Sequence, residues 1–109
     1  DFWNTCCSPC RSAIRSNGPH KAGELASDDL VWIYIANETS PIGTYLKMIP
    51  DIKGLHYRLN DEQWRYICDY FKIDGIPSYV LVQKDGAYAL SNEFRDHDLM
   101  VKTLKKLVK

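Results

Sequence analysis

Two cysteines, Cys7 and Cys10, are separated only by Ser8-Pro9 and lie between an apolar, strand-like segment and a helix-like one. The first backbone N–H groups of a helix have no partner within it and carry partial positive charge. A thiol at that position is stabilised as the thiolate, which is the form that attacks disulfides. Pro9 is tolerated in a first turn, because the N–H that it lacks would be unpaired there. The pair can form a disulfide across one turn or ligate a metal, and a strand-then-helix context favours redox chemistry.

The two cysteines are expected to have different roles. Cys7, at the helix start, would be the exposed nucleophile, and Cys10, one turn further and more buried, would resolve the mixed disulfide. A zinc site needs four ligands. The sequence has neither a second Cys-x-x-Cys pair nor a spaced pair of histidines, so we expect a redox pair and no metal.

Three segments together resemble the thioredoxin superfamily. Residues 1–11 resemble its active-site signature, residues 71–82 its cis-proline segment and following strand, and Lys84-Asp85-Gly86 its hairpin turn. The long middle segment is similar to the TlpA/ResA-like branch, which is found outside the bacterial cytoplasm. The resemblance covers nearly the whole chain and implies one thioredoxin-like domain over 1–109. The implied fold is a three-layer α/β/α arrangement around a mixed central sheet.

The resemblance also implies an activity. Members of this family are thiol–disulfide oxidoreductases without a bound cofactor, and their substrates are disulfides or dithiols of other proteins. The branch implies a reductant in the periplasm, fed by a membrane electron donor. An X–Pro bond is cis in only about 5–6% of folded cases, yet the resemblance implies that Pro77 is cis and lies beside the cysteines. It assigns substrate binding to Pro77 and to the backbone of Ile76. We expect Trp3 to pack near the motif and to contribute to substrate binding as well.

Asp1 lies six residues before Cys7. In thioredoxins an aspartate at this spacing is buried beneath the disulfide and accepts the proton of the second cysteine, so the resemblance implies a catalytic role for Asp1. A desolvated carboxyl group with a raised pKa suits that task. The alternative is a solvated carboxylate at the end of the chain.

Cys6 is the clearest departure from the family, which usually has tryptophan at this position. Its simplest interpretation is a small apolar replacement. It can also compete for disulfide pairing, or join Cys10 and His97 in a copper site similar to that of Sco-type chaperones, although Arg11 replaces the proline usual there. A further alternative is an adaptor module that keeps the fold and lacks turnover.

Other candidate residues have ordinary interpretations. Cys68 lies on the apolar face of a predicted helix, and we expect an inert core thiol. Glu38 follows a predicted strand and is either an acid near the site or a surface carboxylate. His20 and His56 are expected at the surface.

Composition limits the partners. The 14 basic and 14 acidic residues balance, which argues against an electrostatic role on nucleic acid or a membrane surface. A chain of 109 residues suits one domain with one core, and it contains no apolar run of the roughly 18 residues that a membrane span needs. The strand and helix that precede Asp1 in the family are absent here. We therefore expect a trimmed monomer, with a dimer through the uncovered edge as the alternative.

Turn and cap signals predict the first half of the chain. A helix over 7–16 should break at Asn17-Gly18-Pro19 and be followed by a short helical piece over 20–26. The apolar run 30–36 predicts a strand buried on both faces. Ser40-Pro41 should cap a helix that ends at Pro50. Its predicted apolar face consists of Ile42, Tyr45, Leu46 and Ile49.

The second half is predicted in the same way. Residues 54–59 should form an extended connection with room for a short strand. Asn60 and Gln63 predict a capping box at the start of a helix, whose apolar face consists of Trp64, Ile67, Cys68 and Phe71. Strands over 79–83 and 87–90 should form a hairpin. The last helix should begin near Asp96. One face should carry lysines, and the opposite, apolar face should consist of Met100, Val101, Leu104, Leu107 and Val108.

Overall fold

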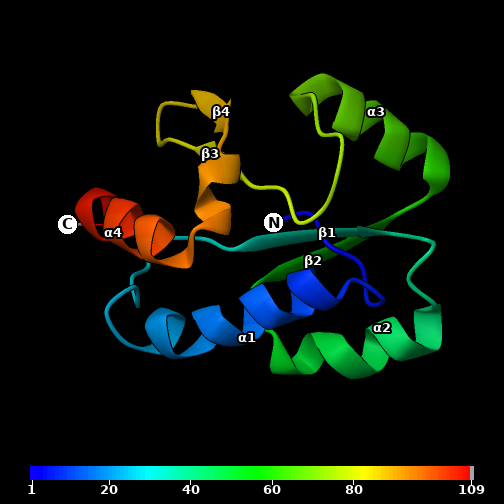
Figure 1. Ribbon diagram of the computed structural model, residues 1–109, viewed down its shortest axis with the longest axis horizontal. Coiled ribbons are helices and arrows are strands. Elements are labelled where there is room, and N and C mark those ends of the chain that lie inside the picture. The colour runs from blue at the N-terminus through cyan, green and yellow to red at the C-terminus, as the bar shows by residue number, and fades with distance from the viewer. Residues whose placement is uncertain (109) are drawn as a thin grey trace.

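The computed structural model describes residues 1–108. Helices and strands alternate along most of the chain, which confirms the α/β class (Figure 1). The elements, including two short 3-10 helices labelled η, are α1 (Ser8–Ala22), β1 (Ile33–Asn37), α2 (Ile42–Met48), η1 (Ile49–Asp51), β2 (Leu55–Leu59), α3 (Asp61–Phe71), β3 (Val80–Val82), β4 (Tyr88–Leu90), η2 (Asn92–Arg95) and α4 (His97–Leu107).

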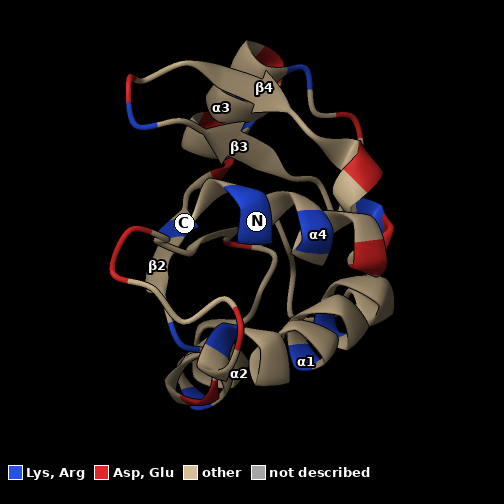
Figure 2. Ribbon diagram, turned by 90° about the vertical axis from the view of Figure 1, so that its left-hand side faces the viewer, with Lys and Arg blue, Asp and Glu red and all other residues tan. Residues whose placement is uncertain are grey.

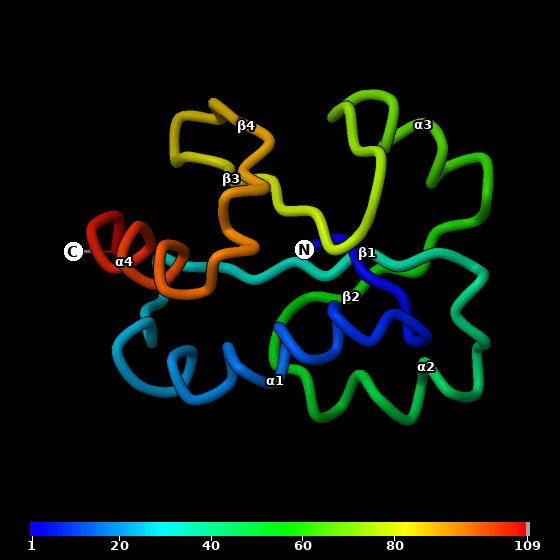
Figure 3. Tube along the Cα trace, viewed as in Figure 1, coloured from blue at the N-terminus to red at the C-terminus, as the bar shows by residue number. Residues whose placement is uncertain are grey.

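The strands form two small sheets rather than the expected continuous mixed sheet. β1 pairs in parallel with β2, and β3 pairs antiparallel with β4. Phe2 lies between the sheets and forms a parallel bridge to Ile35 and an antiparallel bridge to Ser78. The N-terminal segment does not extend into a longer strand, because the chain already turns at Thr5-Cys6 toward α1. Figure 3 shows the chain after α3 descending to the N-terminal segment before it reaches β3.

The helices cover opposite sides of these strands. Successive side chains of an extended segment point to opposite faces. The Phe2 ring packs edge-on against Trp64 and Phe71 of α3, at centroid distances of 5.8 and 6.3 Å. The Trp3 ring lies 6.2 Å from that of Tyr45 in α2. Figures 1 and 2 accordingly show α1 and α2 on one side of β1 and β2 and α3 on the other.

Two groups of buried side chains stabilise the fold. The first fills the space between β1, α1 and α2, and it consists of Trp3, Cys10, Ile14, Tyr34, Ala36 and Tyr45. The second lies under α4, and it consists of Leu25, Tyr79, Phe94, Met100, Val101 and Leu104. The buried members from α4 confirm most of its predicted apolar face, although Leu107 is exposed.

The predicted helix break at Asn17-Gly18-Pro19 is wrong. α1 continues through these residues to Ala22, and Gly23 caps it by donating to the carbonyl oxygens of Pro19 and His20. Cys10 and Ile14 of α1 are buried in the group around Trp3. Packing of this apolar face outweighs the cost of a proline inside the helix, although the buried Asn17 amide has no hydrogen-bond partner among the described residues. No second helical piece forms over 20–26, because only its first three residues are helical and they belong to α1.

Two further expectations need correction. β1 begins at Ile33 rather than residue 30, and Ile33 is 42% exposed, so the strand is not buried on both faces at its start. In α2 only Tyr45 is buried, whereas Ile42 and Leu46 are 53% and 56% exposed. Ser40 does not cap α2. Its Oγ instead accepts a hydrogen bond from the Thr5 N–H at 3.0 Å.

Several local predictions are confirmed. Asn60 and Gln63 form the capping box of α3, and Asp96 caps α4. Residues 55–59 form β2, so the predicted extended connection does carry a strand. The hairpin joins shorter strands than predicted, over Val80–Val82 and Tyr88–Leu90.

Candidate active site

The Cys7–Cys10 pair lies at the N-terminus of α1, where it forms a disulfide with a Cα–Cα distance of 5.2 Å. Cys7 is the N-cap residue, and its Sγ accepts a hydrogen bond from the Cys10 N–H at 3.3 Å. Pro9 lies in the first turn, as its sequence position predicts. The Cys10 N–H in the first turn of α1 therefore points at the sulfur of Cys7, an arrangement that stabilises a thiolate.

The two sulfurs differ in exposure. Cys7 is partly exposed, and the neighbouring Ser8 and Pro9 are exposed. Cys10 is 1% exposed and belongs to the buried group around Trp3. A partner molecule can therefore reach Cys7 but not Cys10.

The peptide bond between Ile76 and Pro77 is cis. Phe2 N–H donates to Ser78 O at 2.9 Å, and Ser78 N–H donates back to Phe2 O at 3.4 Å. This antiparallel pairing directs Ile76 and Pro77 along the chain toward Asn4 and the cysteines. Ile76 packs against the buried group that contains Cys10. The two segments that the resemblance pairs are therefore adjacent.

Trp3 is fully buried in the same group as Cys10, so it supports the site from within rather than at its surface. Such a position favours packing, and a side chain with no exposed surface makes no direct contact with a substrate.

The Asp1 carboxyl group is buried, and neither of its oxygens has a hydrogen-bond partner among the described residues. Asp1 and Trp3 flank Phe2 in an extended segment, so their side chains point to the face covered by α1, which carries Cys10. The expectation of a buried carboxyl group on this face agrees with the structure, and the solvated alternative does not.

Cys6 is exposed and lies outside the disulfide. Its backbone N–H donates to Asn4 Oδ1 at 2.7 Å, which fixes the turn before α1. His97 instead packs on the ring of His20, near the opposite end of α1, at a centroid distance of 4.9 Å. Ten residues of α-helix between Cys10 and His20 span roughly 15 Å, so Cys6, Cys10 and His97 are not brought together. Among residues 1–108, no group of three or more potential metal ligands forms.

A cavity of about 350 Å³ lies next to these residues, on the α3 side, and no local sequence pattern indicates it. Residues from four separate parts of the chain line it, among them Asn4, Asn37, Trp64, Asp74 and Ile76. The cavity can be recognised only once the fold has brought these residues together. A larger groove of about 760 Å³ runs along the outer side of α3 and includes Tyr66 and Tyr70, but it contains none of the predicted site residues.

Two minor candidates have different positions from those expected. Cys68 is partly exposed and lines the smaller cavity rather than the core. Burial and the neighbouring Asp69 carboxylate raise the pKa of the Cys68 thiol, which makes it a poor nucleophile. Glu38 is exposed, and its Oε1 accepts a hydrogen bond from the Asp61 N–H at the start of α3. It therefore supports the helix N-terminus rather than the cysteines.

Comparisons with known proteins do not add to this picture. No family model matches the sequence, and no curated protein or solved structure is similar to it at a significant level. None of the helices within residues 1–108 has the length and apolar character that crossing a membrane requires. Function is therefore inferred from the motif and its surroundings.

Proposed function

We propose that this chain is a thioredoxin-fold thiol–disulfide oxidoreductase of the TlpA/ResA-like kind, which exchanges disulfides with other proteins through Cys7 and Cys10. The observation that carries the proposal is the asymmetric pair at the start of α1, with Cys7 accessible and Cys10 buried, beside a cis proline. The layered α/β arrangement supports the fold assignment, although within residues 1–108 the two sheets share backbone hydrogen bonds only through the segment 1–3.

In the proposed cycle, the reduced protein transfers two electrons to a partner disulfide. The Cys7 thiolate attacks one partner sulfur, a Cys7–partner disulfide forms, and the other partner sulfur leaves as a thiolate. Cys10 then loses its proton and attacks the Cys7 sulfur, which breaks the mixed disulfide and releases the second partner thiolate. The Cys7–Cys10 disulfide remains and needs a dithiol donor to be reduced again.

Three further residues assist this cycle. The Asp1 carboxylate, on the same face as Cys10, takes the proton that Cys10 loses. The backbone of Ile76, before the cis proline, pairs with an extended partner segment that approaches Cys7. Trp3 holds Cys10 in place from within the core. The proposed setting is the periplasm, with a membrane electron donor and the protein as a monomer.

An adaptor module without turnover is the competing proposal, and the exposed aromatic side chains of Tyr66 and Tyr70 favour it. Large exposed apolar surfaces mark sites of interaction. The two proposals differ in what they require of Cys7. An oxidoreductase needs a reactive thiolate, whereas an adaptor needs only a surface.

Insulin disulfide reduction distinguishes them. Cys7→Ser should abolish turnover, and Cys10→Ser should accumulate mixed disulfides that gel electrophoresis without reductant detects. Cys6→Ser is the matched control, because it removes the adjacent thiol and leaves the redox pair, and it should keep turnover. Full turnover by the Cys7→Ser protein would refute the assignment.

Alkylation gives a second measurement on the reduced protein. Cys7 lies at the helix N-terminus and Cys6 does not, so iodoacetamide near neutral pH should label Cys7 faster, as followed by peptide mass mapping. Equal rates at the two thiols would favour the adaptor.

Asp1→Asn tests the proton acceptor. General-base catalysis is worth about a hundredfold or more, so the variant should resolve mixed disulfides more slowly by that factor and lose the pH dependence of this step. Rapid-quench measurement of a preformed mixed disulfide reports the rate directly. An unchanged pH profile would remove Asp1 from the mechanism.

A further inference from the structure

The 350 Å³ cavity beside the candidate active site has three kinds of wall. Trp64, Ile73 and Ile76 supply an apolar wall. Asn4, Asn37 and Thr39 supply a polar one. Asp69 and Asp74 are exposed and line the opening. Its volume is at the small end of ligand pockets, which are typically about 300–1,000 Å³, and it suits one long side chain rather than a whole cofactor.

The cavity adjoins both segments of the candidate site, the one that carries the cysteines and the one that carries the cis proline. Asn4 lies three residues before Cys7, and its Oδ1 holds the Cys6 N–H. Ile76 precedes the cis Pro77. A polypeptide that pairs with the backbone of Ile76 while its sulfur meets Cys7 therefore passes the opening of this cavity.

The polar wall is fixed by its own hydrogen bonds. Asn4 Nδ2 donates to Thr39 Oγ1, and Asn37 Oδ1 accepts from the Thr39 N–H at 3.2 Å. These groups are already partnered, so they shape the cavity. The charged groups that a ligand would meet at the opening are the carboxylates of Asp69 and Asp74.

The opening carries negative charge. Among the described residues neither Asp69 nor Asp74 forms an ion pair. Arg65, which also lines the cavity, is paired with Asp61 in the same helix. Lys72, at the C-terminal cap of α3, is exposed and forms no ion pair within residues 1–108.

We propose that this cavity receives a lysine or arginine side chain that lies next to the reactive cysteine of the protein substrate. This inference rests on the proposed function and assigns its substrate class. Long basic side chains bury their aliphatic stems against apolar surface and keep their charged heads in water, which matches the Trp64, Ile73 and Ile76 wall and the acidic opening. The face of a tryptophan ring also attracts a cation. A glutamate at the same position would meet two carboxylates, so repulsion would reject acidic sequences.

Three peptides test the inference, each with one cysteine linked by a disulfide to a small reporter thiol. They are identical except for Lys, Gln or Glu next to the cysteine. The measurement is kcat/KM for release of the reporter. The wild-type protein should prefer the Lys peptide over the Glu peptide about tenfold, because the Lys head is attracted and the Glu head repelled, and each such interaction at an exposed site changes the rate by up to about fivefold.

The Asp69→Asn/Asp74→Asn variant should reduce this preference to about twofold. Asp28→Asn/Asp51→Asn is the matched control, because it changes the net charge equally at exposed positions outside the cavity lining. It should keep the wild-type preference. An equal loss in both variants, or no preference in the wild type, would overturn the inference.

A binding measurement separates this inference from the proposed function. Peptides with serine in place of the cysteine cannot react, and calorimetric titration reports their affinity alone. Tighter binding of the Lys form without turnover of any disulfide peptide would refute the proposed oxidoreductase activity and support the assignment of the cavity to a basic side chain. Turnover with equal binding of the Lys and Glu forms would overturn the cavity assignment and leave the oxidoreductase intact.

Discussion

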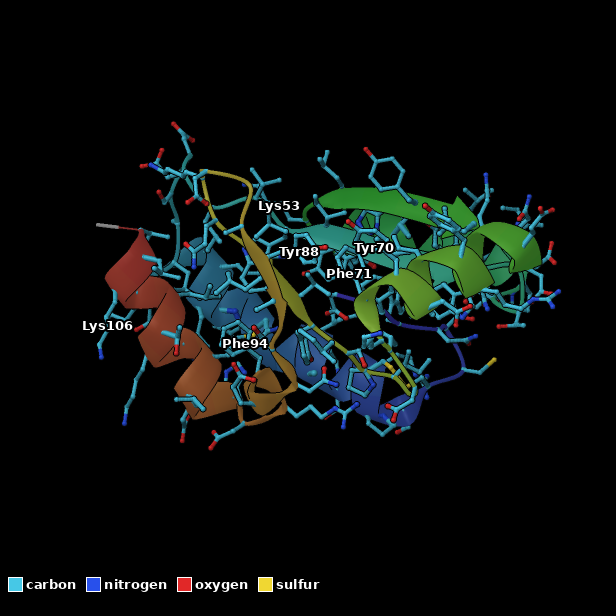
Figure 4. The ribbon with its side chains drawn as sticks, turned by 90° about the horizontal axis from the view of Figure 1, so that it is seen from above. Lys53, Tyr70, Phe71, Tyr88, Phe94 and Lys106 are labelled. Atoms are coloured by element: carbon cyan, nitrogen blue, oxygen red, sulfur yellow. A yellow bond between two sulfur atoms is a disulfide. The ribbon has the colours of Figure 1, made fainter. Side chains whose placement is uncertain are left out.

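The two sides of the β1–β2 sheet differ in how completely they are covered. On the side of α1 and α2, Trp3, Tyr34 and Ala36 are fully buried. On the side of α3, no residue of the helix is buried, and Tyr66 is 73% exposed. Figure 4 shows Tyr70 and Phe71 of α3 beside Tyr88 of the hairpin, where the Tyr88 hydroxyl donates to that of Tyr70 at 2.9 Å.

This contrast separates two tasks. Cys10 is anchored in the closed side, where close packing fixes the geometry that thiol exchange needs. The cavity that we assign to substrate recognition lies on the open side, where side chains remain accessible. If the proposed function holds, substitutions in the cavity should change selectivity without changing the chemistry of the cysteine pair.

The largest effect is expected from replacing one aromatic side chain on each side of the β1–β2 sheet. Trp3→Ala removes a fully buried side chain and should lower the free energy of unfolding by about 3–5 kcal/mol. Tyr66→Ala, on the open side, should change it by less than about 0.5 kcal/mol. Urea denaturation measures both. Similar losses would mean that α3 is covered in solution, for example by another copy of the chain.

An intermediate effect is expected at the cap of α3. Asn60→Ala removes the side-chain acceptor of the capping box and should cost about 1 kcal/mol. Because α3 has no buried residue, the loss should appear as fraying of its first turn. Faster amide exchange at Gln63 would report it, and Asn60→Ser, which keeps an acceptor, should restore protection. Unchanged exchange in the alanine variant would show that packing alone holds this end.

The smallest effect concerns Lys21, on the closed side. Its Nζ donates to the Tyr34 hydroxyl at 2.7 Å and lies over the rings of Trp32 and Tyr34. Burial, together with repulsion from Lys53, lowers the pKa of Lys21 from 10.5 to about 8. Between these values the unfolded chain binds more protons than the folded one, so this group adds stability as pH rises.

The check is the difference in unfolding free energy between wild type and Lys21→Met, measured by urea from pH 7 to 9.5. It should shift in favour of the wild type as pH rises. The change should stay below about 1 kcal/mol, because Lys21 is only half-buried and solvent screens it. A difference that falls with pH would mean that the ring contacts dominate and hold Lys21 charged.

The sequence predicted the features that depend on neighbouring residues. The capping box at Asn60 and the start of α1 at the cysteine pair follow from local hydrogen bonding and helix electrostatics. The continuation of α1 through Pro19 could not be predicted, because it depends on the packing of Cys10 and Ile14 against distant residues. Periodicity correctly grouped Ile42 and Leu46 on one helix face, but it could not tell whether anything covers that face.

The candidate site divides in the same way. Cys7 and Cys10 were found from their spacing, and the proximity of Pro77 came from a family resemblance rather than from periodicity. The cavity could not have been found, because Asn37, Asp69 and Asp74 are ordinary surface residue types until the fold brings them together.

Within residues 1–108 the two sheets share backbone hydrogen bonds only through the segment 1–3. Asp1 O and Trp3 N–H bond to Ile35 of β1, whereas Phe2 N–H and O bond to Ser78. Because this connection is so short, the two sheets can unfold cooperatively only while these hydrogen bonds are formed. The amides of Phe2 and Ser78 should therefore lose protection together, in sub-global openings that leave the pairing of β1 with β2 intact. Since Cys7 lies five residues after Phe2, each such opening would also loosen the turn before α1 that positions Cys7.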